Sequence, residues 1–542
     1  MIFLFTLFLS VLLTISLIPV LSRLAYCCNT LDLPDERKVH ARPIPRIGGV
    51  AMAVGSLVSV VAWNFGDTLL RAFLAAALVL VAFGLIDDLR SLSPRAKLLG
   101  QLIAALIVVV FGGVEIRSLG SLLPDGLSVP VWAAIPFTVF VIVGVTNAVN
   151  LADGLDGLAG GICLLTFCCI GYLAYLDGAA AIGLAALAFI GAIFGFLRFN
   201  THPASIFMGD TGSQLLGFAA ITFSLALTQR GTALSPLLPL VLLGFPVLDT
   251  MTVMCTRIAA GRSPFSADKN HFHHSLLELG FRHPESVLVI YAIQTVLVIS
   301  ALAFRFHSDW LLLGGYLLFS AAVLSLFAAA RRYGWRLKRF DILDLVIVGG
   351  LRKLREEGVL IKVLFRIFRL TVPFLLLCAC LLPESVPGYL AKAAPLVALL
   401  LLLAWFLGKE RLGLLLRPTL YLLIPFAVYL SETAAAGWAG GHVRVLYNGL
   451  FIACALGSLL VSKFSRRTTG FRSTPLDFLI LFIVAVFPFL HGVQSLDYLP
   501  GIIAAKVIIL YFSYEVLLNE LRGKLGAPAC MTILCLLVLC CR

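Results

Sequence analysis

Long apolar runs alternate with short polar segments along the whole chain. In residues 1–330, runs long enough to cross a bilayer as helices predict about 11 transmembrane helices. They lie near residues 2–22, 49–63, 69–86, 98–111, 131–146, 161–176, 179–197, 213–228, 237–255, 287–304 and 311–330. After residue 369, further runs predict about 7 more helices, near residues 370–382, 389–407, 420–430, 445–461, 478–490, 502–518 and 530–541. Because lipid offers no partner for open backbone groups, the pattern predicts an all-α, polytopic integral membrane protein.

Composition and charge agree with this fold class. Hydrophobic residues make up 61% of the chain and charged residues 13%, with a net charge of +13. The basic residues concentrate in the loops after the first, third and ninth predicted helices, which places those loops on the cytoplasmic side. The excess charge therefore orients the helices and does not indicate a nucleic-acid partner. The first run lacks a basic leader and a cleavage site, so we expect a retained span.

Four polar clusters interrupt the apolar pattern, namely GLIDDL, NAVNLADGLDGLAGG, FMGDTGSQLLG and DKNHFHHSL. The predicted topology puts all of them on the cytoplasmic side, at helix ends. Charged groups at membrane depth are costly and usually face a cavity or an aqueous surface. Carboxylates, amides and imidazoles gathered in this way predict a metal-assisted reaction at the membrane surface.

Asp87 and Asp88 end the third predicted helix. Adjacent carboxylates can bind a hard cation such as Mg²⁺, which prefers oxygen ligands and commonly bridges to phosphates. A solvated helix end is the alternative explanation. Arg90, Arg95 and Lys97 follow and could meet phosphate, although orientation of the loop explains them as well.

The segment NAVNLADGLDGLAGG is more specific. Asp153 and Asp156 are three residues apart and would share a face if the segment were helical. Asn147 and Asn150 add amides nearby, and the glycines permit close approach of a ligand. The segment predicts a site for a nucleotide and a metal, with a polar turn that caps the next helix as the alternative.

Asp210 and the histidines complete the candidate site. Asp210 precedes a helix, where backbone N–H groups could meet a phosphate while its carboxylate meets a cation; helix capping is the alternative. His271, His273 and His274 have neither the HExxH spacing nor a cysteine pair that would favour zinc. Beside Lys269 they are better suited to a diphosphate.

These motifs, in this order, resemble the polyprenyl-phosphate N-acetylhexosamine-1-phosphate transferase family, also called the glycosyltransferase 4 family. The resemblance covers about the first 330 residues and rests on DLPDERKVH with PRIGG, GLIDDL, NAVNLADGLDGLAGG, FMGDTGS and SPFSADKNHFHHSLLELGF. It implies transfer of a sugar 1-phosphate from a UDP-sugar to a polyprenyl phosphate such as undecaprenyl phosphate, with release of UMP. It also implies Mg²⁺ as cofactor, with Mn²⁺ as an alternative, and an active site on the cytoplasmic face of the bacterial inner membrane.

The resemblance assigns roles by motif. Asp87 would be the base that deprotonates the lipid phosphate, while Asp210, Asp88 and Asn150 would hold the metal. The expected substrate contacts are Asn147, Asn150, Asp153 and Asp156 for the nucleotide, Asn200 and Phe207 for uridine, and Lys269, His271, His273 and His274 for the diphosphate. Direct attack by the lipid is preferred, and a covalent intermediate on Asp210 remains an alternative.

The HxHH form of the histidine motif is similar to WecA-like members and favours UDP-N-acetylglucosamine or a related donor. Transfer of phospho-MurNAc-pentapeptide, as in MraY-like members, is the alternative. Lys269 departs from the Arg that is frequent in WecA-like sequences, and it cannot make the bidentate phosphate contact of Arg.

Three segments follow from this assignment: residues 1–330 as the transferase domain, 331–369 as a basic amphipathic cytoplasmic linker, and 370–542 as a further membrane domain of unassigned role. The last could bind a later glycosyltransferase or a flippase, and a homodimer is also open. A transporter is less consistent with the motifs, because transporter sites lie near the midplane. A non-catalytic scaffold is disfavoured because every expected carboxylate is present.

Overall fold

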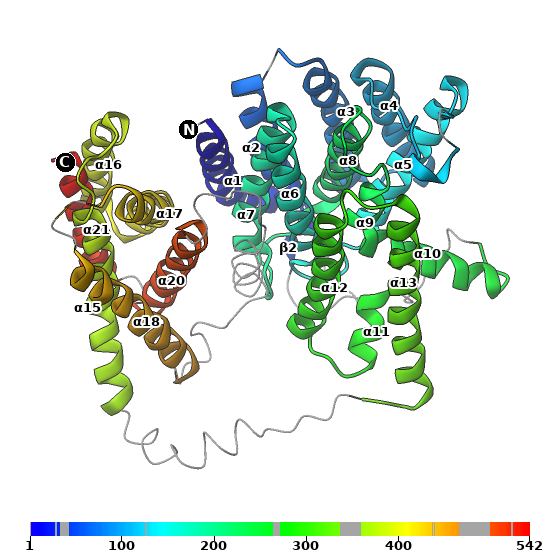
Figure 1. Ribbon diagram of the computed structural model, residues 1–542. Helices are drawn as coiled ribbons and strands as arrows, with labels where there is room; N and C mark the ends of the chain where they lie inside the picture. The colour runs from blue at the N-terminus through cyan, green and yellow to red at the C-terminus, as the bar shows by residue number, and fades with distance from the viewer. Residues whose placement is uncertain are drawn as a thin grey trace. The chain divides into compact units, whose positions relative to one another are not determined.

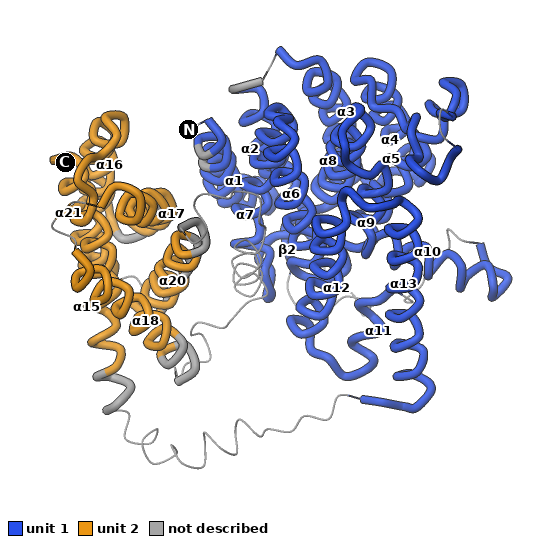
Figure 2. Tube along the Cα trace, viewed as in Figure 1, with its two compact units in different colours: residues 1–337, 474–476 blue, residues 338–473, 477–542 orange. Residues whose placement is uncertain are grey.

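The computed structural model describes residues 2–27, 30–32, 43–64, 66–124, 127–263, 271–336, 359–435, 437, 440–464, 499–521 and 524–541. Within these residues, twelve helices are long and apolar enough to cross a membrane. The predicted all-α, multi-pass membrane fold is therefore confirmed. The chain divides into two compact units: Met1–Leu337 with Thr474–Leu476, and Lys338–Ser473 with Asp477–Arg542 (Figure 2).

Unit 1 is a bundle of helices with one very short antiparallel strand pair, in which Leu31 lies opposite Pro45 and Asp32 opposite Ile44. Its elements are α1 (Ile2–Cys27), β1 (Leu31–Asp32), β2 (Ile44–Pro45), α2 (Gly48–Asn64), α3 (Thr68–Arg90), α4 (Pro94–Gly112), the 3₁₀ turn η1 (Gly120–Leu122), α5 (Val131–Leu151), α6 (Leu158–Leu176), α7 (Ala180–Asn200), α8 (Gly209–Thr228), α9 (Leu238–Leu242), α10 (Gly244–Ala259), α11 (Phe272–Glu278), α12 (His283–Ala303) and α13 (Asp309–Arg332).

Helix α8 lies at the centre of unit 1, where it contacts α2, α3, α5 and α6 (Figure 1). Its whole candidate span is buried inside the protein, and it is the least hydrophobic of the candidate spans among the described residues. Because α8 faces protein and not lipid, it tolerates buried polar side chains such as Gln214, Thr222 and Ser224. Close approach is also required, since a side chain at Gly49 of α2 would overlap the backbone of Gly212.

The predicted span at residues 237–255 is two helices in the structure, α9 and α10, which meet at Leu243. Pro246 explains the break, because it has no N–H to donate to the carbonyl of Leu242 four residues earlier. That carbonyl instead accepts hydrogen bonds from Gln294 (2.7 Å) and Thr166 (3.1 Å). The side chains of neighbouring helices thus satisfy the backbone at the break.

Unit 2 contains, among its described residues, α15 (Val359–Leu381), α16 (Gly388–Leu407), α17 (Lys409–Thr433), α18 (Gly441–Phe464), α20 (Leu499–Glu520) and α21 (Gly526–Cys540). These helices enclose their own apolar core. Within it, the buried Lys506 forms an ion pair with Glu432 and lies 4.4 Å from the centre of the Tyr447 ring.

The structure bears on two predicted segments in the second part of the chain, residues 478–490 and 331–369. The predicted span at residues 478–490 lies outside the described residues. The predicted linker, residues 331–369, overlaps two helices of the structure, because α13 ends at Arg332 and α15 begins at Val359. Apolar positions of α15 such as Val372 and Leu375 are fully buried in the core of unit 2, which draws this helix into the unit.

Candidate active site

The ends of α3, α5 and α7 and the beginnings of α4, α6 and α8 come together in unit 1, because successive helices run antiparallel. Three carboxylates meet there: Asp87 and Asp88 from the end of α3, and Asp210 from the first turn of α8. One oxygen atom of each lies within 4.8 Å of the others. The fold therefore brings together the acidic residues of two separate sequence clusters, as the sequence predicted.

Asp88 is fixed by α8. Its Oδ1 accepts the backbone N–H of Asp210 (2.9 Å), and its Oδ2 accepts the N–H (3.1 Å) and hydroxyl (2.6 Å) of Thr211. These donors include orphan N–H groups of the helix start, which no residue within the helix can satisfy. Asp88 consequently anchors α8 beside α3.

Lys97, from the first turn of α4, lies between the other two carboxylates. Its Nζ atom is 2.6 Å from Asp87 Oδ2 and 2.8 Å from Asp210 Oδ2. Asp87 Oδ1 also accepts the N–H of Leu92 at 2.6 Å. The sequence indicated only a basic residue able to meet phosphate, whereas the structure makes Lys97 the positive partner of the acidic group.

A layer of amide side chains lies beside the carboxylates. Asn147 and Gln101 exchange hydrogen bonds of 2.8 and 3.2 Å, and Gln101 also donates to Gln214 at 3.2 Å. Asn150 donates to Ser213 at 2.7 Å and contacts Asp210. Carboxylate and amide oxygens are suitable ligands for Mg²⁺, so Asp87, Asp88, Asp210 and Asn150 fit a divalent cation.

Asp153 and Asp156 lie in the loop between α5 and α6, and their environments differ. Burial raises the pKa of Asp153 to about 7, and the nearby charges of Asp210, Asp156 and Asp88 act in the same direction. Burial also acts to raise the pKa of Asp156, but hydrogen bonds from His202 and the N–H of Ala204, together with His283, hold it below its usual value. The pKa values of two carboxyls in one loop are therefore shifted in opposite directions.

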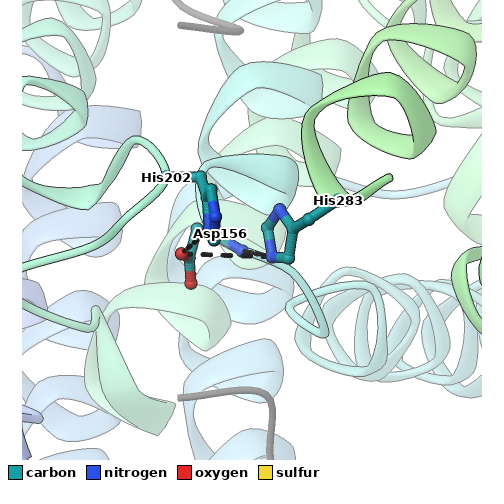
Figure 3. A group of neighbouring side chains, drawn as sticks. All are labelled: Asp156, His202 and His283. Atoms are coloured by element: carbon teal, nitrogen blue, oxygen red, sulfur yellow. Dashed lines mark hydrogen bonds and ion pairs between the residues drawn. The ribbon is translucent and has the colours of Figure 1, made fainter. Parts of the chain in front are cut away.

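Asp156 is held by two histidines that the sequence analysis did not identify (Figure 3). Its Oδ2 is 2.8 Å from His202 Nδ1, and its backbone N–H donates to His283 Nε2 at 3.2 Å. The two imidazole rings stack with centroids 4.2 Å apart. His202 and His283 are distant from Asp156 in the sequence and lie outside its motif, so no local pattern could have marked them.

These three residues are also close enough to bind a metal, since one ligand atom of each lies within 4.8 Å of the others. The hydrogen bonds decide against that role. His283 Nε2 already accepts the N–H of Asp156. Its other nitrogen, Nδ1, is buried and has no hydrogen-bond partner among the described residues, whereas a metal-bound histidine normally donates its second N–H. We therefore interpret the group as the support that fixes the Asp156 carboxylate.

The two residues predicted to contact uridine, Asn200 and Phe207, lie in different surroundings. Asn200 is only 2% exposed, accepts the N–H of Gly157 (2.9 Å) and donates to the carbonyl of Ile206 (2.8 Å). The amide oxygen and the amide nitrogen of Asn200 are both used within the protein, so its side chain joins two loops. Phe207 is half-buried, and its backbone carbonyl accepts the N–H of Gly48 at the start of α2 (2.9 Å).

The histidines of the motif have different neighbours in the structure. His271 Nδ1 lies 2.9 Å from Asp249 Oδ2, and both side chains are buried. His273 packs against Gly154, where any side chain would overlap the imidazole ring. Burial, followed by the neighbouring His274 and His271, lowers the pKa of His273 to about 3, so it is neutral at pH 7. His274 contacts the ring of His273, and Lys269 lies outside the described residues.

Comparison with known proteins gives consistent results. Residues 70–228 match the model of glycosyl transferase family 4. A probable undecaprenyl-phosphate N-acetylglucosaminyl 1-phosphate transferase of Bacillus subtilis is 39% identical over 55% of this chain and 84% of its own length. The undecaprenyl-phosphate alpha-N-acetylglucosaminyl 1-phosphate transferase of Escherichia coli K12 is 31% identical over 57% and 86%. The decaprenyl-phosphate N-acetylglucosaminephosphotransferase of Mycobacterium leprae is 37% identical over 49% and 75%.

Proposed function

We propose, because this chain belongs to glycosyl transferase family 4, that it transfers N-acetylglucosamine 1-phosphate from a UDP-sugar to undecaprenyl phosphate or a similar polyprenyl phosphate. The names of the similar proteins support both the lipid acceptor and the sugar. The observation that carries the proposal is the meeting of Asp87 and Asp88, at the end of α3, with Asp210, at the start of α8, beside the loop of Asp153 and Asp156. The products are a polyprenyl-diphosphate sugar and UMP.

The residues suit a phosphoryl transfer, which depends on alignment and charge neutralisation more than on covalent chemistry. An oxygen of the lipid phosphate attacks the β-phosphorus of the donor, and the bond from that phosphorus to the bridging oxygen breaks, so that UMP leaves with the electron pair. Asp87, whose Oδ2 faces Lys97, takes the proton of the lipid phosphate. The Lys97 ammonium then turns to the phosphate oxygens.

A divalent cation such as Mg²⁺ would be held by Asp210, with Asn150 beside it, next to the Asp87 base. When bound, it supplies positive charge against the donor diphosphate. Asp88 supports this arrangement from behind, because its oxygens are occupied by the start of α8. Asp153 and Asp156, the latter fixed by His202, are placed to recognise the nucleotide.

Location in the cytoplasmic membrane of a bacterium, with the site facing the cytoplasm, belongs to the same proposal. It is supported by the basic loops after the first, third and ninth predicted helices and by the bacterial origin of the similar proteins. UDP-sugars are made in the cytoplasm, so a site on that face would have access to its donor.

The direct test is UMP release by detergent-purified protein with Mg²⁺, undecaprenyl phosphate and a panel of UDP-sugars that includes UDP-MurNAc-pentapeptide. We expect lipid-dependent UMP from UDP-N-acetylglucosamine, lost in Asp87→Asn and Asp210→Asn. Turnover with no donor would refute the proposal. Lipid-independent exchange of UMP in the wild type that disappears in Asp210→Asn would favour a covalent intermediate over direct attack.

A further inference from the structure

Asp249 of α10 and His271, which directly precedes α11, form a buried pair separate from the carboxylate group. Asp249 is 2% exposed and His271 is 7% exposed, and Oδ2 of the carboxylate lies 2.9 Å from Nδ1 of the imidazole. A carboxylate can only accept a hydrogen bond. The proton of this hydrogen bond must therefore be on Nδ1, which leaves Nε2 as the ring nitrogen available to a ligand.

The second oxygen of Asp249 is also used. Its Oδ1 accepts the backbone N–H of Phe272 at 2.9 Å, an N–H at the start of α11 that has no partner within that helix. One carboxylate thus accepts two N–H groups from consecutive residues. An asparagine could not do this, because one of its two positions would present an NH₂ group to an N–H.

The pair is joined to the proposed donor site through stacked rings. The imidazoles of His271 and His273 are nearly parallel, at 10° with centroids 5.8 Å apart. His273 in turn lies against Gly154, in the same loop as Asp153 and Asp156. The orientation of His271 is consequently linked to the loop that would recognise the nucleotide.

We infer that Asp249 is a positioning residue that directs His271 Nε2 toward the diphosphate of the UDP-sugar; this rests on the proposed function. A phosphate oxygen accepts and cannot donate, so His271 must donate from Nε2 as well as from Nδ1 in that complex. The ring then carries a positive charge, and the Asp249 carboxylate offsets it through a charge-assisted hydrogen bond. His271 touches the substrate, and Asp249 acts through His271.

The test is a double-mutant cycle with Asp249→Asn and His271→Gln, read as kcat and KM for each substrate. We expect Asp249→Asn to lower kcat/KM for the UDP-sugar by about 10- to 100-fold, the usual cost of losing a group that orients a functional histidine. KM for the lipid should not change. Added to His271→Gln, Asp249→Asn should cause little further loss, because both act through one contact.

Asp309→Asn is the matched control. Asp309 is 7% exposed and, like Asp249, accepts several hydrogen bonds, from the N–H and hydroxyl of Ser121 and from Ser235. A similar fall in kcat/KM in this variant, or fully additive losses in the cycle, would overturn the inference. Where Asp249→Asn does not fold, Asp249→Glu replaces it in the cycle, and its effect must again vanish in the His271→Gln background.

A spectroscopic readout separates this inference from the proposed reaction. In protein labelled with ¹⁵N-histidine, the His271 signals are identified by their loss in His271→Gln. The wild type should show a protonated Nδ1, and Asp249→Asn should change that state. Unchanged His271 signals in Asp249→Asn would refute the positioning role even if UMP release is observed, whereas changed signals without UMP release would refute the reaction alone.

Discussion

The Lys97 ammonium lies 2.8 Å from the Asp210 carboxylate, although 113 positions separate the two residues. The same Nζ atom contacts Asp87 at 2.6 Å, so two carboxylates share one positive charge. A divalent cation held by Asp210 would have to compete with this ammonium. The first prediction follows from that competition.

Replacing Lys97 with Met should strengthen cation binding and weaken catalysis. The carboxylates lose their internal positive charge, so Mg²⁺ should raise the melting temperature at lower concentration than in the wild type. We expect kcat to fall by about 100-fold or more, the scale of losing one charge-stabilising donor. Arg95→Met is the control, because Arg95 is an exposed residue of the same helix turn. Weaker Mg²⁺ binding in Lys97→Met would contradict the prediction.

Asp88→Asn should lose both stability and activity. Asp88 accepts three hydrogen bonds from Asp210 and Thr211, and an asparagine would leave a donor facing donors, at a cost of about 1–3 kcal/mol. Thermal unfolding with and without Mg²⁺ measures this. Thr211→Val, which removes only the hydroxyl, should have a smaller effect. An Asp88→Asn protein that melts like the wild type would show that the anchor of α8 is not needed.

Gly154→Ala should weaken the use of the UDP-sugar without unfolding the protein. A Cβ atom at residue 154 would overlap the His273 ring and force the histidine segment away from the donor loop. We expect a higher KM for the UDP-sugar and an unchanged KM for the lipid. Gly144→Ala on α5 is the control, because a Cβ there would have no neighbour within 4 Å. Equal kinetics in the two variants would argue against the contact.

Asp153→Asn should stabilise the metal-free protein at high pH. The pKa of Asp153 is about 7 in the folded protein against an ordinary 3.8, so the folded state holds this proton more tightly than the unfolded chain. Stability from this group therefore falls as pH rises from about 4 to 7. The variant should be more stable than the wild type at pH 8, by up to about 4 kcal/mol, and the difference should shrink at pH 5.

Asp156→Asn is the counterpart with the opposite sign. Because the pKa of Asp156 is lowered in the folded protein, its carboxylate contributes stability above its ordinary pKa, and that contribution is lost as pH falls. At pH 8 the variant should therefore melt below the wild type. The same direction of change in both variants would refute the opposed tuning of the two carboxyls.

A chain that ends after Arg336 should keep its transferase activity. Every site contact described above lies within unit 1, and unit 2 has a separate core. UMP release in membranes should stay within about twofold of the full-length protein. A large loss, with the truncated protein still inserted and folded, would assign the C-terminal helices an essential catalytic role. Full activity would direct the search for their role toward a partner glycosyltransferase or flippase.

The sequence by itself determined the membrane class of the protein and the candidate residues of its active site. Apolar run length decides whether a segment can span a bilayer, and this signal is local. Placing a carboxylate such as Asp87 or Asp210 next to a membrane span costs free energy, so such residues usually serve a function. Each motif could therefore be identified from its own local sequence. The break between α9 and α10 at Leu243 was not predicted, because Pro246 lies within a continuous apolar run.

Only the tertiary structure decided how those residues share their tasks. Asp87 and Asp88 are adjacent in the chain, yet one faces Lys97 and the other anchors α8. Asp249, His202 and His283 belong to none of the sequence motifs. The fold brings His202 and His283 to Asp156, and Asp249 to His271, from segments that are distant in the sequence. Hydrogen bonding depends on distance and direction between side chains, and neither is encoded in the spacing of residues along the chain.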